Sequence, residues 1–317
     1  MKIYLLDAIN KLGVAKLQER ADVVLPDDPE IAGWREHAEG IILRGATFVT
    51  AADLDQCKCL KAISKHGTGV DRIDLEAAKD KGVVVMNTPS LNADAVSEMA
   101  VALALAVGRH VVFADHALRI GQDIRREDFD GSAAGTGGRG MEGKTVGVVG
   151  LGAIGRKVVD KWRLGFNMTV LGFDPHLPDE AWETIPCERI DALSDLLHRV
   201  DLLCLHVPLT PQTKHLIGAN ELAQMKPEAI LVNLARGGVV DEDALYQALV
   251  NKQLFGAALD VFEQEPPIRH KLFGLQNFVG TPHIGGGTQD SREQMALMVA
   301  EQLMDALDGE PPRNRVA

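Results

Sequence analysis

Three ionisable side chains follow apolar runs that are typical of buried parallel strands. Arg236 comes directly after "ILVNLA", Glu265 lies in "AALDVFEQEPP", and His283 lies in "FVGTPHIGGG". Histidine is the usual acid or base near neutral pH, and a carboxylate bonded to its second ring nitrogen fixes its tautomer. Arginine can clamp a carboxylate through two parallel hydrogen bonds. Together the three residues predict a site for a 2-hydroxy or 2-oxo acid.

Two of these residues have structural alternatives. Arg236 could instead cap the end of the preceding strand, or pair with Asp241 or Glu242, which follow it closely in the chain. Glu263 and Glu265 stand on either side of one glutamine, and spacing alone does not choose between them as the partner of a histidine. Both questions stay open at the level of sequence.

A glycine-rich segment predicts a dinucleotide site. "KTVGVVGLGAIGRKVV" holds Gly150, Gly152 and Gly155 in G-x-G-x-x-G spacing, after an apolar strand and at the start of a helix. The first glycine allows the tight turn, the second lets backbone approach a pyrophosphate, and the third lets the helix pack on the strand. Free N–H groups and the dipole at the helix N-terminus favour an anion there.

A carboxylate after the next strand supports this prediction. "MTVLGFD" ends in Asp174, 24 residues after Gly150, where an acid should accept hydrogen bonds from the adenosine ribose. No arginine follows directly that could hold a 2′-phosphate, so NAD is favoured over NADP. The alternative is that Asp174 merely begins a turn before Pro175.

Two further histidines lie near the same segments. His270, in "PPIRHKLFG", competes with His283 as the base, but its polar loop favours a solvated ring. His206 follows the apolar run "DLLCL". It either lines the cofactor crevice or satisfies backbone groups, and the sequence leaves both interpretations open.

The strands that must position these residues form two series. In the first we expect strands at 2–6, 40–43, 60–64 and 83–86, with a helix in "DLEAAKDKG" that Asp74 caps and Gly82 ends. Strands alternating with helices imply parallel sheets with right-handed crossovers, so the predicted fold class is α/β. The expected strands of the second series are 144–149, 168–173, 201–206, 229–234, 256–260 and 277–280.

The series are joined by "NADAVSEMAVALALAVGRHVVFADHALRIGQ", which is helical and apolar nearly all round. We expect it to be buried against a domain or a second subunit, as a dimer element. The glycine-rich segment 130–143 predicts a linking loop. The last stretch, "SREQMALMVAEQLMDALDGEPP", predicts an amphipathic helix that ends at Gly309 and Pro311.

Composition excludes several classes of protein. The 317 residues are 46% hydrophobic, 25% charged and large enough for two domains, and the net charge of -12 argues against a nucleic-acid partner. The N-terminus lacks signal-peptide features, and the longest apolar run, Met99 to Val107, is too short to span a bilayer, so we expect a cytoplasmic protein with no membrane partner. For the cysteines at 57, 59, 187 and 204 we expect no metal site and no disulfide, with Cys204 in the core.

In order and spacing, "GLGAIG", Asp174, "NLARGGVVDEDAL", "ALDVFEQEPP" and "TPHIGGG" resemble the D-isomer-specific 2-hydroxyacid dehydrogenase family. The similarity covers essentially the whole chain and is greatest to the catalytic core of the D-3-phosphoglycerate dehydrogenases. It implies an NAD-dependent enzyme that interconverts a 2-hydroxy acid and its 2-oxo acid by hydride transfer. A homodimer is the expected assembly.

The resemblance also implies a role for each residue. Arg236 would bind the substrate carboxylate and carbonyl, His283 would be the acid/base, and Glu265 rather than Glu263 would support it. Asp260 would contact the nicotinamide carboxamide. The full set of predicted cofactor-binding residues is Gly150, Gly152, Ala153, Ile154, Gly155, Asp174, His206, Val207, Pro208, Ala235 and Asp260.

The family's substrate loop matches "KHGTGVDRID", whose backbone N–H groups at Thr68, Gly69 and Val70 would approach the substrate carboxylate. Basic residues hold the distal phosphate in phosphoglycerate dehydrogenases. Those that fall near the corresponding places here are Arg44, Lys65, and Arg125 or Arg126.

Two positions depart from the phosphoglycerate pattern. Lys65 stands where arginine is more usual, and His66 stands where a small residue is usual. The distal group could therefore be a phosphate, a sulfonate, a second carboxylate or a bulkier group, and ordinary surface charge is the alternative for Arg44 and Lys65. The predicted substrate-binding residues are Arg44, Lys65, His66, Thr68, Gly69 and Val70.

The resemblance implies two Rossmann-like or flavodoxin-like α/β domains, each with a doubly wound parallel sheet, and a cleft between them. Residues 1–93 with 291–317 would form a substrate-binding lid domain, and 94–290 the NAD-binding Rossmann domain. Closure would exclude water from the hydride transfer. The C-terminal regulatory domains of longer phosphoglycerate dehydrogenases, and their feedback by serine, are not expected.

Two other functions share this set of motifs. Dinucleotide-sensing corepressors resemble the family and keep its arginine, glutamate and histidine, and phosphonate-type dehydrogenases on the same fold use the same three residues. The sequence leaves open which 2-hydroxy acid is the substrate, which enantiomer is used and which direction is preferred.

Overall fold

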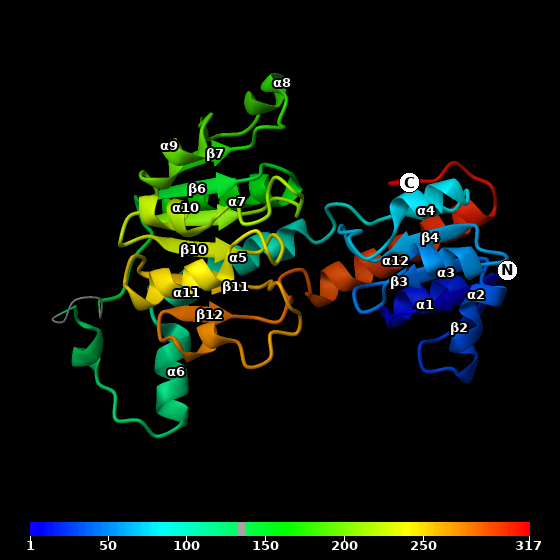
Figure 1. The fold of residues 1–317 in the computed structure, drawn as a ribbon, viewed down its shortest axis with the longest axis horizontal. Coiled ribbons are helices and arrows are strands. Elements are labelled where there is room, and N and C mark those ends of the chain that lie inside the picture. The colour runs from blue at the N-terminus through cyan, green and yellow to red at the C-terminus, as the bar shows by residue number, and fades with distance from the viewer. Residues whose placement is uncertain (132–136) are drawn as a thin grey trace. The chain divides into compact units, whose positions relative to one another are not determined.

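The computed structural model describes residues 1–131 and 137–317, so the predicted linking loop at 130–143 lies partly outside the described residues. The chain divides into two compact units (Figure 1). Unit 1 consists of Met1–Asn92 and Gly287–Ala317, and unit 2 of Ala93–Gly286. Both termini therefore belong to unit 1. The predicted role of this unit as a lid stays a prediction.

Unit 1 is built on a five-stranded parallel sheet of order β2-β1-β3-β4-β5. The strand β2 is not predicted from sequence, because it is short and begins with the exposed Asp22. The strands are β1 (Lys2–Leu5), β2 (Asp22–Val24), β3 (Gly40–Leu43), β4 (Ala62–Lys65) and β5 (Val84–Met86). The α-helices are α1 (Lys11–Gln18), α2 (Trp34–His37), α3 (Ala51–Gln56), α4 (Leu75–Asp80) and α12 (Gln289–Leu307), with a 3-10 helix η1 (Pro29–Gly33).

Helices cover both faces of this sheet. One apolar cluster joins the sheet to α1 and α12, and another joins it to α2, α3 and α4. The fully buried Gln302 of α12 donates hydrogen bonds to Ser64 Oγ at 2.8 Å and to Asn87 O at 3.1 Å, so the C-terminal helix is a structural part of unit 1. The predicted cap holds as well, since Asp74 accepts a hydrogen bond from Ala77 N at 3.0 Å.

Unit 2 contains a seven-stranded parallel sheet of order β12-β11-β10-β9-β6-β7-β8. The strands are β6 (Thr145–Val149), β7 (Thr169–Phe173), β8 (Glu188–Arg189), β9 (Leu202–Leu205), β10 (Ile230–Asn233), β11 (Gly256–Leu259) and β12 (Phe278–Gly280). The two-residue edge strand β8 is exposed and has no apolar pattern to predict it. The order of connection reverses between β6 and β9, and ligands bind outside the carboxyl ends of strands at such a point.

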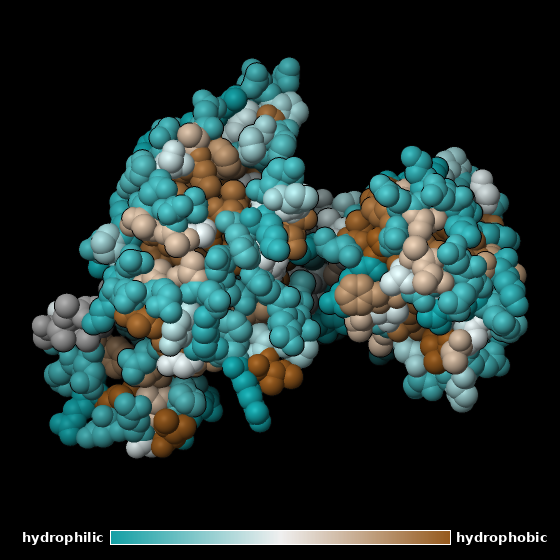
Figure 2. All heavy atoms as spheres, viewed as in Figure 1, coloured by the Kyte–Doolittle hydropathy of each residue, from teal (hydrophilic) through white to brown (hydrophobic). Residues whose placement is uncertain are grey.

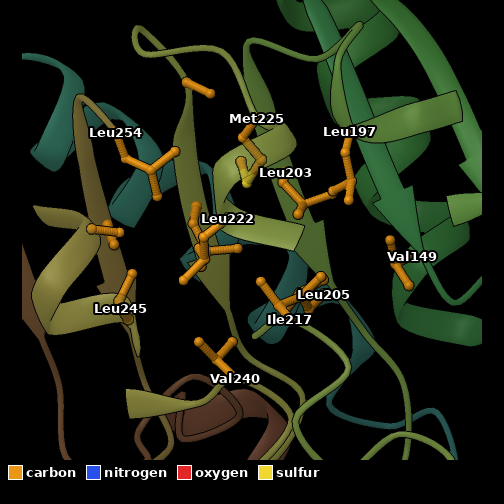
Figure 3. Close-up of a cluster of buried hydrophobic side chains, with 14 of the residues drawn as sticks. Val149, Leu197, Leu203, Leu205, Ile217, Leu222, Met225, Val240, Leu245 and Leu254 are labelled. Carbon is orange, nitrogen blue, oxygen red and sulfur yellow. The ribbon is translucent and has the colours of Figure 1, made fainter. Parts of the chain in front are cut away.

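A different set of helices covers each face of this sheet. Alternate strand residues pack against α5 (Ala93–Gly108) and α7 (Ala153–Phe166) on one face. The other face packs against α9 (Leu193–Leu197), α10 (Ala219–Gln224) and α11 (Glu242–Val250), in the cluster that Figure 3 shows around Leu203, Leu205 and Leu222. Cys204 is fully buried, as predicted. Helices on both faces of two parallel sheets confirm the predicted α/β class.

The remaining helical pieces of unit 2 are α6 (Val111–Arg119), α8 (Asp179–Trp182), η2 (Arg126–Phe129) and η3 (Lys271–Gly274). The long apolar stretch forms two helices rather than one, because His110 adopts a left-handed conformation with a φ of 53°. Within the part of the chain that the structure describes, no single helix is long and apolar enough to cross a membrane, and only α5 and α6 together, bent by 65°, pass that test of length and composition.

Candidate active site

The three glycines after β6 are needed for different reasons. Gly150 has a φ of 90°, and a Cβ there would lie 2.6 Å from His206 O. A Cβ on Gly155 would lie 2.0 Å from Gly150 O, so α7 approaches the loop only because this residue is glycine. A Cβ on Gly152 would meet no described atom within 4 Å, and Gly152 provides no side-chain cap for α7.

The glycine loop therefore has room for an external anion. The first and third glycines allow close packing of neighbouring backbone, whereas the second leaves open space beside the N-terminus of α7. Ala153 and Ile154 form the first turn of that helix and keep part of their surface accessible. Backbone N–H groups at such a terminus bind phosphate well, and this geometry fits the pyrophosphate of a dinucleotide.

Asp174 follows β7 and contacts the same loop. Its Oδ2 accepts a hydrogen bond from Leu151 N at 2.9 Å, and its Oδ1 accepts one from His176 N at 3.1 Å. The second bond is the local turn that the sequence offered as an alternative. The first holds the carboxylate against the glycine loop, so the two interpretations are compatible.

His206 follows β9 across the point where the strand order reverses. Both of its ring nitrogens are buried and have no hydrogen-bond partner among the described residues. Burial lowers the pKa of His206 to about 4, so the ring is neutral at physiological pH. Of the two interpretations left open by the sequence, hydrogen bonding of the ring to backbone is therefore wrong. Val207 packs over Gly150, and Pro208 is exposed.

The structure brings His283 and Glu265 together. His283 Nδ1 lies 3.0 Å from Glu265 Oε2, with side-chain exposures of 50% and 26%. The other oxygen, Glu265 Oε1, accepts a hydrogen bond from Phe262 N at 3.3 Å. A carboxylate accepts the Nδ1 proton, so the lone pair of the neutral ring lies on Nε2. Within the described residues, Nε2 makes no hydrogen bond.

Asp260 organises the loop that carries His283. This buried residue follows β11, and its Oδ1 accepts hydrogen bonds from Thr281 Oγ1 at 2.6 Å and Ile284 N at 2.9 Å. Its Oδ2 accepts one from Gly285 N at 2.8 Å, and its carbonyl accepts one from His283 N at 2.7 Å. No spacing rule in the sequence indicates this role. The predicted contact of Asp260 with a nicotinamide stays a prediction.

Arg236 follows β10 and stands directly before Gly237 and Gly238, where the chain turns. Its Nη1 donates to Ala235 O at 2.7 Å, while the Asn233 side chain accepts from Ala235 N at 2.9 Å and donates to Arg236 O at 3.0 Å. A Cβ on Gly237 would lie 1.9 Å from Phe262 O, and Gly238 has a φ of 81°. The two glycines therefore let the chain turn away directly after Arg236.

The structure resolves the choice between Glu263 and Glu265 and corrects one expectation. Glu263 pairs with His215, at 2.9 Å from its Nε2, so Glu265 is the partner of His283. Asp241 caps α11 through Asp243 N and Ala244 N. The expectation of a solvated His270 is wrong, because its Nε2 lies 2.9 Å from Glu242 Oε2 and the ring is held beside Phe262.

In unit 1, Asp7 organises the loop of Arg44, and the sequence contains no signal for this role. Asp7 Oδ2 accepts hydrogen bonds from Arg44 N at 2.6 Å and Gly45 N at 2.8 Å, and Oδ1 accepts one from Thr47 Oγ1 at 2.9 Å. Burial by itself raises the pKa of Asp7, but these hydrogen bonds outweigh it and the net pKa lies below its ordinary value. The carboxylate therefore stays charged and holds the loop in place.

The predicted substrate residues of unit 1 differ in environment. Arg44 is exposed, whereas Lys65 is buried and its ammonium donates to Arg44 O and His66 O, so the surface-charge alternative is wrong for Lys65. His66 is buried, and its burial, followed by the charge of Arg44, lowers its pKa to about 4. Within the described chain, the N–H groups of Thr68, Gly69 and Val70 make no hydrogen bond.

Arg292, at the start of α12, is a residue that sequence reasoning missed. Its Nε is buried without a partner among the described residues. Burial, followed by the charge of Arg292, lowers the pKa of Arg44. Arg125 pairs with Asp123 at 3.1 Å instead and belongs to unit 2.

The fold and the site define a dinucleotide-binding α/β protein with a histidine–carboxylate pair at the carboxyl edge of its sheet. Residues 101–285 match the family described as "D-isomer specific 2-hydroxyacid dehydrogenase, NAD binding domain". A hydroxypyruvate reductase of Thermotoga maritima is 40% identical over 92% of this chain and 96% of its own length. The chain belongs to the D-isomer specific 2-hydroxyacid dehydrogenase family, which confirms the resemblance.

Other relatives carry different names. A D-3-phosphoglycerate dehydrogenase of Methanocaldococcus jannaschii is 39% identical over 100% of this chain, which spans only 59% of that protein. The TT0316 protein from Thermus thermophilus has a crystal structure that matches with a TM-score of 0.90 and 36% identity over 100% of both chains. Members of the family are dehydrogenases and reductases that use NAD or NADP, so the predicted type of cofactor is confirmed.

Proposed function

We propose that this protein interconverts a 2-hydroxy acid and its 2-oxo acid with NAD. The observation that carries the proposal is the 3.0 Å hydrogen bond between His283 Nδ1 and Glu265, on loops at the same sheet edge as the glycine loop. An imidazole that a carboxylate holds at Nδ1, with Nε2 unbonded by the described residues, is suited to take up and return a proton.

In the oxidising direction, His283 Nε2 takes the proton of the substrate hydroxyl. Arg236 binds the carboxylate and stabilises the developing carbonyl, and Glu265 balances the charge that the imidazole gains. NAD, held by the glycine loop and Asp174, would supply the acceptor for the hydride that leaves C2. In the reducing direction the protonated His283 returns its proton to the new hydroxyl oxygen.

We further propose that the substrate carries a second anionic group. Arg44 and Arg292 bring two positive charges to unit 1, where the charge of Arg292 lowers the pKa of Arg44, and the carboxylate of Asp7 is engaged by backbone N–H groups. His66 adds no charge because its pKa is about 4. A site with a surplus of positive charge favours a phosphate, a sulfonate or a second carboxylate over a neutral distal group.

A substrate panel tests both proposals. It compares phosphite with both enantiomers of lactate, glycerate, malate, sulfolactate and 3-phosphoglycerate, with NAD and with NADP, by the rate of reduced-cofactor formation. We expect the highest kcat/KM with NAD and an acid that has a second anionic group. Turnover of phosphite alone would favour a phosphonate-type dehydrogenase. NADH binding without turnover of any substrate would favour a dinucleotide sensor.

Asp174→Ala should raise the KM for NAD and reduce the preference for NAD over NADP. The carboxylate that would accept ribose hydroxyls is lost, and so is the charge that repels a 2′-phosphate. The measurement is the ratio of kcat/KM values for the two cofactors. Asp179→Ala, which removes an exposed carboxylate paired with Arg189 at 2.6 Å, is the control. An unchanged ratio in the Asp174 variant would exclude the ribose role.

We propose that the protein forms a homodimer through α6. This helix and its C-cap residue expose Val111, Val112, Leu118 and Ile120, and Figure 2 shows hydrophobic surface where Figure 1 places the helix. Exposed apolar clusters of this kind mark interaction sites. Light scattering on the purified protein should give twice the chain mass, and Leu118→Glu with Ile120→Glu should give monomers. A monomeric unmodified protein would contradict the proposal.

A further inference from the structure

Two additional histidine–glutamate pairs border the loop that carries Glu265. Glu242, the first residue of α11, lies with its Oε2 2.9 Å from His270 Nε2. Glu263 lies with its Oε1 2.9 Å from His215 Nε2. Together with the His283–Glu265 pair, three such pairs meet at residues 262–265, all within unit 2.

The backbone of this loop connects the pairs. Two consecutive N–H groups each donate to a carboxylate, Phe262 N to Glu265 Oε1 at 3.3 Å and Glu263 N to Glu242 Oε1 at 2.7 Å. The same short stretch of chain is therefore bonded on one side to the carboxylate that holds His283 and on the other to Glu242. A shift of the Glu263 N–H toward or away from α11 would move the adjoining N–H that bonds Glu265.

The Glu242–His270 pair is built to be rigid. The Glu242 side chain is 10% exposed and that of His270 is 23% exposed, and the His270 ring packs 5.7 Å from the Phe262 ring between centroids. His270 Nδ1 accepts a hydrogen bond from Leu272 N at 3.4 Å, at the start of η3. Nδ1 is thus an acceptor, so the proton of the neutral ring lies on Nε2 and is donated to Glu242.

The charges around Glu242 come from three segments. The N-cap Asp241 and the helix residue Asp243 flank it in the chain, the loop after β11 contributes Glu263, and the N-cap of η3 contributes His270. Burial raises the pKa of Glu242, while the Glu263 N–H and His270 act in the opposite direction. Glu242 is thus a buried acceptor whose two hydrogen bonds are directed at one loop.

We infer that Glu242 and His270 are positioning residues, which hold the 262–265 backbone so that Glu265 meets His283 in the orientation needed for proton transfer. This inference rests on the proposed function for its kinetic consequences. Neither residue touches the reacting atoms; each acts through the backbone and Glu265. Small misplacements of a group in an active site can lower rates by as much as about 10²-fold.

The variants are Glu242→Gln and His270→Gln, with Asp243→Asn as the matched control. If the side-chain carbonyl in Glu242→Gln keeps the bond to Glu263 N, the new amide N–H₂ group faces the His270 donor and one hydrogen bond is lost. His270→Gln removes the ring from a less buried position and serves if the first variant fails to fold. Asp243 follows Glu242 on the same helix, but its side chain is 88% exposed and pairs with Lys271.

We expect kcat to fall about 10-fold or more in Glu242→Gln and His270→Gln, with little change in the KM for NAD. Asp243→Asn should keep the original kcat. When Glu265→Gln is already present, Glu242→Gln should lower kcat much less than it does in the unmodified protein. The effects of residues that act through one another are not additive. Unchanged kcat in both glutamine variants, or full additivity with Glu265→Gln, would overturn the inference.

A spectroscopic measurement separates this inference from the proposed function. The His283 Nδ1 proton bonded to Glu265 should give a downfield proton resonance, assigned by its loss in His283→Ala. Glu242→Gln and His270→Gln should shift or broaden it, and Asp243→Asn should not. If the protein turns over no substrate, the proposed function fails, yet the resonance still tests the positioning role. A resonance unchanged in both glutamine variants would overturn the inference.

Discussion

His283→Ala is expected to lower kcat by roughly 10²–10⁴-fold, the contribution of a positioned acid or base. The alanine side chain cannot take the hydroxyl proton in oxidation or return it in reduction. Glu265 would then lose the partner that lies 3.0 Å from its Oε2. NADH affinity should change little, because the glycine loop and Asp174 lie after other strands. Steady-state rates and NADH fluorescence titration measure the two quantities.

The control for this variant is His198→Ala, which removes an exposed histidine at the end of α9. It should keep the original rate. A His283→Ala protein that retained near-normal turnover would remove His283 as the acid/base. His270 could not replace it without leaving Glu242, to which its Nε2 is bonded.

Arg236→Ala should lower kcat by roughly 10²–10³-fold and also raise the KM for the acid substrate. The guanidinium is proposed both to bind the carboxylate and to stabilise charge that develops on the carbonyl oxygen. Arg236→Lys should raise the KM less than Arg236→Ala does, because lysine restores a positive charge but not the planar pair of donors. Steady-state kinetics of the two variants would separate charge from geometry.

The matched control is Arg199→Ala, which removes an exposed arginine paired with Glu188 at 2.7 Å. It should leave kcat and KM unchanged. If Arg236→Ala bound and turned over substrate normally, its role would be confined to the turn that it makes with Ala235 and Asn233.

The strands of unit 2 illustrate why much of the fold is predictable. Strands buried on both faces are continuous apolar runs, and the six predicted strands of the second series overlap β6, β7, β9, β10, β11 and β12. The edge strands β2 and β8 lack such a run because they are short and partly exposed. Their pairing depends on a neighbouring strand and leaves no periodic pattern.

Two buried aspartates mark what spacing cannot reveal. Asp7 follows β1 and accepts N–H groups of the loop after β3, and Asp260 follows β11 and accepts those of the loop after β12. In each case a carboxylate at one strand end holds the loop of an adjacent strand. The partner is distant in sequence, as Asp260 is from Gly285, so only the alignment of strands brings them together.

The sequence by itself determined the α/β class, the glycine loop and the family, because apolar runs and short motifs are local in the chain. The spacing of its residues did not decide whether Glu263 or Glu265 is the partner of His283, and it did not show that His270 has a carboxylate partner. Tertiary structure decided these points: Glu265 bonds His283, while Glu263 and Glu242 bond His215 and His270. The physical reason is that a hydrogen bond depends on positions in space, and these are set when β11, β12 and α11 pack together.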